Sequence, residues 1–428
     1  MILKTSHIEI LAPAGSFESL QAAINAGCHA IYFGIGDMNM RATAAANFSN
    51  EDMPEIVKIC HENNVKAYLT LNTLVYDQEV AEMKTIVETA KKVGIDAVIA
   101  ADMATIAYAN QVGLEVHIST QLSISNIESV KFYSKFSDRL VLARELTIEQ
   151  VKEICEEIKT QDIKGPKGNL IEIEVFAHGA LCVAVSGRCS MSLYCYNTSA
   201  NKGRCTQICR RRYKVTDIDT GKELVVDNNY IMSSSDLCTI GMLDKLVDAG
   251  VSVLKFEGRG RSADYVDTVI KTYKNALKSL EDGTYTSENI IQWNRDLKTV
   301  FNRGTTEGFY MGRKMDEWSG VHGSKATKEK YAIGTVEKYY PKINVVQIAI
   351  QAKDEVESEE EFLIIGPKPG VVKGKIPEFM VNDKPSKVMA QGDVVTFKID
   401  SAVKEGDKFY VVRDRLSDIP KGREVLIK

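Results

Sequence analysis

Residues 1–260 alternate short apolar segments with segments that carry apolar residues at helical spacing, and this alternation limits the choice of fold. Strands that are separated by helices pair in parallel and are joined by right-handed crossovers. The predicted strands are residues 8–11, 30–34, 66–71, 97–100, 115–119, 139–143, 172–176 and 253–257. Eight such strands predict an α/β fold, a (β/α)₈ barrel of the TIM type. An open doubly wound sheet is the alternative, but no glycine-rich phosphate-binding motif follows the first strand.

The pattern changes after residue 318. Residues 319–330 are polar and contain glycine, which is typical of a linker. Beyond them, short runs of alternating apolar and polar residues predict β-strands with turns between them. The predicted organisation is therefore a TIM-like barrel in residues 1–318 with a cysteine-rich insertion at about 180–235, a linker in 319–330, and a small all-β barrel domain in 331–428.

The composition is that of a globular protein with no strong charge bias. The net charge is −4 and 26% of the residues are charged, so binding to nucleic acid would require a local basic patch. The N-terminal residues lack the charged and apolar regions of a signal peptide, and no run of eighteen apolar residues occurs. We therefore expect a cytoplasmic protein that does not associate with a membrane.

Four of the nine cysteines are close together in a segment rich in small residues. They are Cys182, Cys189, Cys205 and Cys209. Thiolates from irregular loops bind zinc or an iron–sulfur cluster. Zinc ribbons present two tightly spaced cysteine pairs, and only the last two of these four are so spaced, which favours the cluster. Zinc and buried unligated thiols are the alternatives, and Cys238 is a further candidate ligand.

The segment EVFAHGALCVAVSGRCSMSLY, residues 174–194, resembles the signature of the collagenase-like peptidase family U32. The resemblance continues through NKGRCTQICRRRY at 201–213 and LAPAGSFESLQAAINAGCHAIYFG at 11–34, so it extends over nearly the whole chain. The family name implies a peptidase. However, the sequence has neither an H-E-x-x-H zinc motif nor a G-x-S-x-G nucleophile motif.

Several members of the family serve instead in oxygen-independent hydroxylation. The group that this chain resembles most makes 5-hydroxyuridine at the wobble position of tRNA, with prephenate as hydroxyl donor. Other groups act on ribosomal RNA or on a ubiquinone precursor, and a paralogous family subunit is a further expected partner. The resemblance implies a 4Fe–4S cluster on the four cysteines named above, with Cys238 as the alternative ligand to Cys209. A U32-type peptidase is the alternative function.

Candidate catalytic residues follow the predicted strands at the end where such barrels build active sites. They are His178, Arg41, Arg144, Glu257 and Arg259. His178 would donate a proton or support the cluster, and a structural role is the equal alternative. The arginines, together with Arg261, would clamp a carboxylate substrate such as prephenate. For each arginine alone, the alternative is a salt bridge to Glu145 or Glu257.

The stretch 202–214 is the most basic part of the chain and also contains aromatic residues. Its cations are Lys202, Arg204, Arg210, Arg211, Arg212 and Lys214, and Tyr194, Tyr196 and Tyr213 lie among or near them. Cations beside stacking aromatic rings are typical of surfaces that bind single-stranded RNA. The stretch therefore predicts contact with tRNA, and pairing of these cations with acids of the chain is the alternative.

Overall fold

The structure, a computed structural model, describes residues 2–43, 47–224, 232–312, 318–320 and 323–415. Residues 225–231 of the predicted insertion, 321–322 of the predicted linker and 416–428 of the predicted β domain lie outside the described residues. The chain divides into two compact units. The first unit contains residues 1–297 and 301–325, and the second contains residues 298–300 and 326–428.

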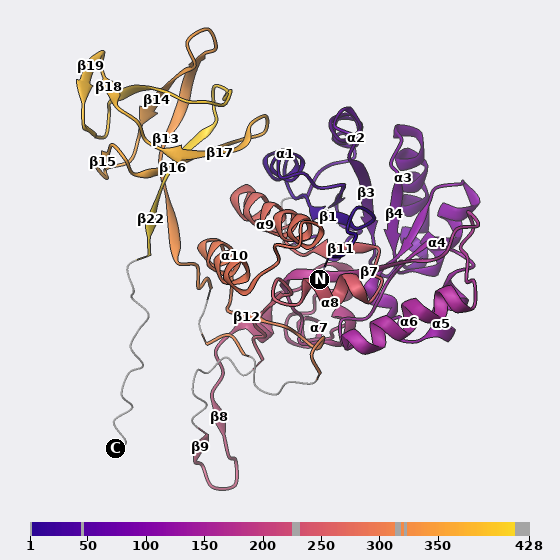
Figure 1. Cartoon of the computed structure of the whole chain (residues 1–428). Helices are drawn as coiled ribbons and strands as arrows, with labels where there is room; N and C mark the ends of the chain where they lie inside the picture. The colour runs from indigo at the N-terminus through magenta and orange to yellow at the C-terminus, as the bar shows by residue number, and fades with distance from the viewer. Residues whose placement is uncertain (1, 44–46, 225–231, 313–317, 321–322, 416–428) are drawn as a thin grey trace. The chain divides into compact units, whose positions relative to one another are not determined.

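The first unit is a closed barrel of parallel strands (Figure 1). In the described residues its strands are β1 Glu9–Pro13, β2 Ala30–Gly34, β3 Lys66–Leu71, β4 Ala97–Ala100, β5 Val116–Ile118, β6 Arg139–Val141, β7 Glu172–Ala180 and β11 Val253–Phe256. From β1 to β7, each strand pairs in parallel with the next strand along the chain. Strand β11 pairs with both β1 and β7, which closes the sheet. The predicted (β/α)₈ barrel is confirmed.

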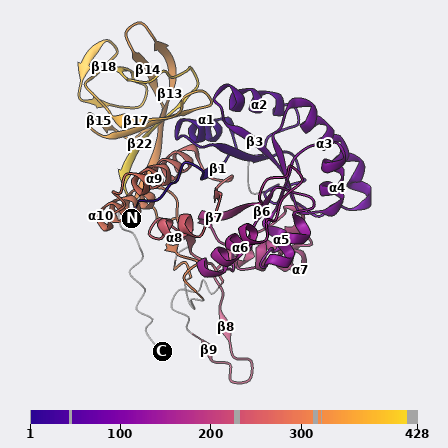
Figure 2. The same cartoon turned by 45° about the vertical axis from the view of Figure 1, so that its right-hand side comes forward.

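Helices alternate with the strands and cover the outside of the barrel (Figures 1 and 2). They are α1 Phe17–Asn25, α2 Met53–Glu62, α3 Val80–Val93, α4 Met103–Gln111, α5 Ile127–Tyr133, α6 Ile148–Thr160, α8 Leu243–Asp248 and α9 Ala263–Glu281, and α10 Ser287–Thr299 follows. Local sequence sets their ends. Ser16 and Ser19 form a capping box at the start of α1, and Gly94 ends α3 with φ 89°, a conformation that favours glycine.

A long insertion separates β7 from β11. It contains the 3₁₀ turns η3 Val185–Gly187, η4 Ala200–Lys202 and η5 Ile208–Arg210, helix α7 Met191–Tyr196, and the strands β8 Val215–Thr216, β9 Glu223–Leu224 and β10 Asp236–Cys238. The β8–β9 hairpin projects away from the barrel in both views (Figures 1 and 2). Strand β10 pairs antiparallel with the end of β7 and parallel with β12 Thr305–Thr306. The end of β7 thus continues beyond the barrel and carries the insertion.

The second unit is an antiparallel β structure around its own apolar core, as the alternating pattern predicts. Its strands are β13 Lys328–Tyr340, β14 Val345–Ile350, β15 Val356–Glu357, β16 Glu361–Gly366, β17 Gly370–Lys375, β18 Phe379–Val381, β19 Lys384–Ser386, β20 Val388–Met389, β21 Val394–Lys398 and β22 Lys408–Asp414. In β14 the buried residues alternate along the strand, so that one face packs on the core. Phe362, Phe397 and Phe409 pack together in that core.

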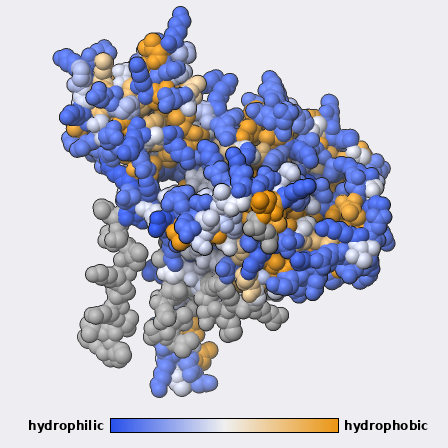
Figure 3. Space-filling view, in the orientation of Figure 1, coloured by the Kyte–Doolittle hydropathy of each residue, from blue (hydrophilic) through white to orange (hydrophobic). Residues whose placement is uncertain are grey.

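The surface in Figure 3 is mostly hydrophilic, with small separate hydrophobic patches. Exposed large apolar or aromatic residues include several from the insertion, among them Val185, Leu193 and Tyr194. In the described part of the chain, none of the helices has the length and apolar character that crossing a membrane requires.

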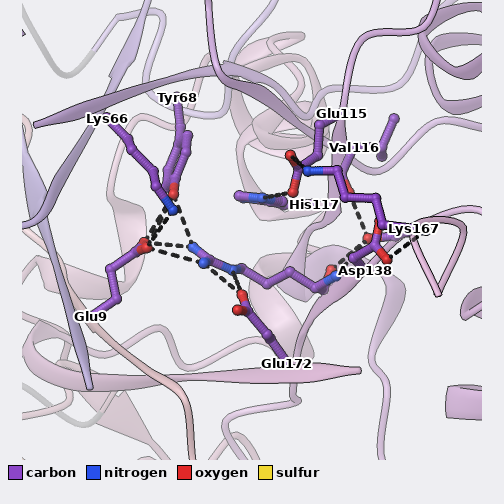
Figure 4. Close-up of polar contacts among 11 residues, drawn as sticks. Glu9, Lys66, Tyr68, Glu115, Val116, His117, Asp138, Lys167 and Glu172 are labelled. Carbon is purple, nitrogen blue, oxygen red and sulfur yellow. Dashed lines mark hydrogen bonds and ion pairs between the residues drawn. The ribbon is translucent and has the colours of Figure 1, made fainter. Parts of the chain in front are cut away.

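Charged side chains lie inside the barrel near the amino ends of its strands (Figure 4). The guanidinium of Arg139 donates to Glu9 at 2.6 and 3.1 Å and to Glu172 at 2.8 Å, and Tyr68 donates to Glu9 at 3.0 Å. Burial alone would raise the pKa of Glu9, but the hydrogen bond and charge of Arg139 lower it to about 2. These contacts link strands β1, β3, β6 and β7 across the interior.

A second buried ion pair joins β7 to β11, the strand that closes the barrel. The ammonium of Lys255 lies 2.7 Å from the carboxylate of Glu174, and both side chains are buried. The Lys255 ammonium also lies 4.7 Å from the ring centre of Tyr32. Removing one partner of such a pair leaves a buried charge without compensation, which is strongly destabilising.

We expect Lys255→Met to lower the free energy of unfolding by about 3–5 kcal/mol, because Glu174 would stay buried without its cation. The double variant Glu174→Gln with Lys255→Met should recover most of that loss. Urea denaturation of the three proteins measures both effects. Equal stability of Lys255→Met and the wild type would show that the pair does not support barrel closure.

Candidate active site

A cavity of about 140 Å³ lies at the carboxyl ends of the barrel strands, beneath the insertion. Its charged and thiol lining consists of Cys182, Cys205, Cys209, Arg41, Arg210, Arg261, Arg303 and Glu257. The cysteines come from the insertion and Glu257 directly follows β11. Because the carboxyl ends of parallel strands meet at one rim, segments far apart in the sequence contribute to one cavity.

Three of the four predicted cluster ligands line this cavity, and the fourth lies near them. Burial raises the pKa of Cys209, Arg210 opposes this effect, and the thiols of Cys182, Cys205 and Cys189 add to it. Cys189 is not part of the lining, and its sulfur accepts a hydrogen bond from the amide of Met191 at 3.4 Å. The insertion therefore gathers the four thiols in one region.

The described residues contain no group of three or more His, Cys, Asp or Glu side chains arranged to hold a single metal ion. A structural zinc site requires four ligands around one ion at about 2.3 Å. A 4Fe–4S cluster binds each thiolate through a different iron atom, so its ligands stand farther apart around a larger space. A set of thiol donors around a cavity is the kind of donor set that such a cluster requires.

The backbone of the insertion adopts left-handed conformations beside the cysteines. Gln207, between Cys205 and Cys209, has φ 53° and lines the cavity, and Gly203 has φ 77°. A Cβ atom on Gly203 would lie 2.1 Å from the carbonyl oxygen of Asn39, in the loop after β2. Glycine at 203 therefore lets the cysteine loop pack directly against the barrel mouth.

Arg41 and Glu257 form a tight pair on the cavity wall. Both the Nε and an Nη atom of Arg41 lie 3.0 Å from the same carboxylate oxygen. Burial would raise the pKa of Glu257, but the charges of Arg41, Arg144 and Arg259 lower it to about 2. Glu257 is therefore a carboxylate at neutral pH and compensates the charge of Arg41, as the salt-bridge alternative predicts.

Arg259 does not line the cavity. Its guanidinium is buried and donates to Thr70 and Asn39, both at 3.0 Å. Burial lowers the pKa of Arg259 to about 10. The segment LAPAGS makes room for this residue, because a Cβ atom on Gly15 would lie 1.9 Å from the Arg259 carbonyl oxygen. Arg259 is therefore a buried structural residue beneath the barrel mouth, where it bonds to Thr70 and Asn39.

Arg144 and His178 also lie outside the cavity lining. The guanidinium of Arg144 lies 3.7 Å from the ring centre of Phe176 and donates to the carbonyl of Ala180 at 3.2 Å. His178 is buried, and its Nδ1 lies 3.4 Å from the hydroxyl of Tyr273. Burial lowers the pKa of His178 to about 3, so the ring is neutral at physiological pH.

Cys238, the alternative ligand, is not brought to the cavity. It lies buried in β10, opposite His178 of β7, and its sulfur accepts a hydrogen bond from Tyr273 at 3.8 Å. The structure places Cys209, rather than Cys238, beside the other thiols.

Two arginines that line the cavity are not among the predicted pocket residues. Arg303, in the loop before β12, was not a candidate, and Arg210 was a candidate only for RNA contact. Arg210 donates to Ser233 at 3.2 Å and to the carbonyls of Ser234 and Leu181. It therefore fastens the insertion to β7 and faces the thiols.

Several cations of the basic stretch pair with acids of the chain. The ion pairs are Lys202 with Glu79, Arg204 with Asp37, and Lys214 with Glu223. Arg211 instead lies 4.9 Å from the ring centre of Tyr196, and the nearby Tyr194 is 88% exposed. The alternative of internal pairing thus holds for part of the stretch, and an exposed aromatic and cationic surface remains around α7.

The neutral state of buried His178 predicts a pH dependence of stability. In the unfolded chain histidine binds a proton below about pH 6.5, whereas folded His178 does so only near its pKa of about 3. The unfolded state therefore holds the extra proton between these values, and the free energy of unfolding should fall by about 1.4 kcal/mol per pH unit as the pH decreases. His178→Phe should remove this contribution.

Chemical denaturation between pH 6.5 and 4.5 measures these slopes. Burial also lowers the pKa of His29 and His117, so the relevant quantity is the difference in slope from the wild type. The matched control is Tyr273→Phe, which removes the neighbouring hydroxyl but keeps the titrating ring. Identical slopes for His178→Phe and the wild type would contradict the buried neutral histidine.

Comparison with known proteins identifies relatives over nearly the full chain. A protein of Porphyromonas gingivalis named collagenase is 46% identical over 408 residues, covering 95% of this chain and 98% of that protein. A tRNA hydroxylation protein of Bacillus subtilis is 30% identical over 376 residues, covering 85% of each. A 23S rRNA 5-hydroxycytidine synthase of Escherichia coli is 32% identical over 323 residues, covering 74% of this chain and 47% of that protein.

The family model described as peptidase family U32 matches residues 15–320, which include the barrel strands from β2 to β11, the insertion and every residue of the cavity lining named above. The resemblance carried by residues 174–194 and 201–213 is therefore confirmed. This chain belongs to peptidase family U32.

Proposed function

We propose that this protein serves in the oxygen-independent hydroxylation of the wobble uridine of tRNA to 5-hydroxyuridine. In this proposal a 4Fe–4S cluster is bound by the four cysteines of the insertion, and prephenate is the hydroxyl donor. The observation that carries the proposal is a cavity at the barrel mouth that is lined by three of these thiols and by four arginines. A relative named as a tRNA hydroxylation protein supports the same activity.

The cysteines that would hold the cluster are Cys182, Cys189, Cys205 and Cys209, and the bound cluster would supply redox chemistry at the barrel mouth. The chain itself provides the surrounding charges. Arg210 and Arg41 lie close enough for their charges to act on the thiols. Such cations stabilise the thiolate form that binds iron.

Hydrogen bonds among residues at the barrel mouth also fix the positions of their side chains. Tyr32 donates to the backbone carbonyl of Phe256 at 2.8 Å and to Glu257 at 3.3 Å, while Arg41 holds the same carboxylate. Burial raises the pKa of Tyr32 well above its ordinary value, so its hydroxyl stays protonated as a donor. These contacts would keep the wall beside the thiols rigid and its protons fixed.

Contact with RNA would fall on the surface around α7. Tyr194, Tyr196 and Arg211 offer exposed rings and a cation, on which unpaired bases can stack. This surface belongs to the same insertion that carries the thiols, so a nucleotide bound there would lie near the cavity. Ribosomal RNA is the alternative substrate, since one relative is named as an rRNA hydroxycytidine synthase.

A peptidase is the second candidate function, favoured by the relative of 46% identity that is named collagenase. Four of the described histidines form side-chain hydrogen bonds, and the partners in these bonds do not indicate a catalytic pair. His29 bonds to the amide of Ile10, His61 to Asp96, His117 to Glu115 and His178 to Tyr273. These partners are a backbone amide, two acids of the chain and a tyrosine, whereas a nucleophilic peptidase needs a base beside Ser or Cys.

We expect tRNA from a strain that lacks this protein to contain no 5-hydroxyuridine derivatives, as measured by mass spectrometry of its nucleosides. The wild-type gene should restore them. Cys205→Ser should restore less than about a hundredth of the wild-type level, because the thiol is a ligand in this proposal. Cys155→Ser is the matched control, since Cys155 is buried in α6 and does not line the cavity, and it should restore them fully.

The same strains and proteins discriminate between the alternatives. If the strain that lacks this protein keeps its uridine modification in tRNA but shows altered ribosomal cytidine, the substrate would be rRNA instead of tRNA. Cleavage of gelatin by purified protein, kept in the Cys205→Ser variant, would establish the peptidase and contradict hydroxylation as the function of this cavity.

A further inference from the structure

Two arginines of the cavity pack against one phenylalanine. The guanidinium of Arg261 lies 3.4 Å from the ring centre of Phe301, and that of Arg303 lies 5.1 Å from the same centre. Both arginines line the cavity. The aromatic ring therefore holds two cationic groups close together at one part of the wall.

The charge at this part of the wall is not balanced by the chain. Arg303 lies 3.4 Å from the carboxylate of Asp236, whose other oxygen accepts the Arg303 amide at 3.1 Å. Within the described part of the chain, Arg261 forms no ion pair and its guanidinium donates no hydrogen bond. Two cations thus share one carboxylate, which leaves one positive charge uncompensated.

The environment of Arg261 makes this imbalance costly. Burial lowers the pKa of Arg261, and the charge of Arg303 lowers it further. A half-buried guanidinium normally satisfies most of its five donors, because unpaired polar groups away from water lose free energy. An anion placed beside the two guanidinium groups would pair with Arg261 and lessen the repulsion from Arg303.

Arg210 lies between this part of the cavity wall and the thiols. The charges that act on Arg210 are those of Arg303, Cys209, Asp236 and Cys182, and its guanidinium already donates to Ser233 and to the carbonyls of Ser234 and Leu181. Those that act on Arg261 come chiefly from Arg303, Tyr265 and Asp236. Arg41 is already paired with Glu257. Arg41 and Arg210 thus already have partners within the chain, whereas the guanidinium of Arg261 has no hydrogen-bond or ion-pair partner among the described residues.

We propose that Arg261 and Arg303 form the binding site for a carboxylate group of a small organic acid, with Phe301 as the surface that positions both guanidinium groups. A guanidinium fork binds a carboxylate through two parallel hydrogen bonds, which fixes its orientation. The inference rests on the proposed function only for the identity of the acid, the hydroxyl donor. It assigns the donor to Arg261 and Arg303 instead of Arg41, Arg144 and Arg259.

Isothermal titration of the full-length, anaerobically purified protein with malonate and with prephenate tests this site. We expect Arg261→Gln and Arg303→Gln each to weaken the binding of both acids by about tenfold or more, since each loses a charged hydrogen-bond donor. Arg261→Lys should fall between them and the wild type. The matched control is Arg295→Gln, an exposed residue of α10 outside the cavity, which should bind both acids as the wild type does.

Iron content and thermal unfolding of each variant accompany the titrations. Normal iron and a normal melting temperature in Arg261→Gln, combined with weak acid binding, support the site. Wild-type affinity for the acids in Arg261→Gln would overturn it, as would failure of the wild type to bind either acid. Loss of iron with unchanged acid binding would also overturn it, because the arginines would then serve the cluster.

These outcomes are separate from those of the tRNA experiment. Acid binding at Arg261 and Arg303 can be present in a protein that does not modify tRNA, and the proposed modification can persist when another part of the cavity binds the acid. Titration therefore tests the inference, and nucleoside analysis tests the proposed function.

Discussion

The candidate site depends on the closure of the barrel by β11, which pairs with β1 on one side and β7 on the other. That closure places Glu257, which follows β11, at the same rim as Cys182, which follows β7. The buried pair of Lys255 and Glu174 joins the same two strands inside the barrel. The pairing of β11 with β7 therefore brings together both the buried ion pair and the residues at the rim of the cavity.

The distribution of charge around the cavity follows from the cost of burying ions. Glu257 compensates Arg41, and the thiols lie beside Arg210. Arg261 and Arg303 lie on one phenylalanine ring, and Arg303 pairs with the carboxylate of Asp236. Because a half-buried charge needs a partner, the lack of an ion pair for Arg261 among the described residues is the basis of the proposed carboxylate site.

The periodicity of residues 1–260 was sufficient to predict the barrel, because each strand and helix is specified by its own local pattern. The seventh predicted strand ends at residue 176, whereas β7 continues to Ala180 through its pairing with β10. Arg259 is predicted to clamp a carboxylate substrate, but Gly15 and Gly34 leave room in which it is buried away from the cavity. Arg303 carried no local signal, because its position depends on the long-range pairing of β12 with β10. The grouping of the cysteines was suggested by their spacing, but the exclusion of Cys238 required its strand pairing.

The central claim is that the thiols of the insertion hold an iron–sulfur cluster. Analysis of iron and acid-labile sulfide in anaerobically purified full-length protein tests this claim most directly. We predict about four iron and about four sulfide per chain, with visible absorption near 400 nm, and their loss in Cys205→Ser. One zinc ion per chain, or a colourless protein free of iron and sulfide after anaerobic reconstitution, would contradict it.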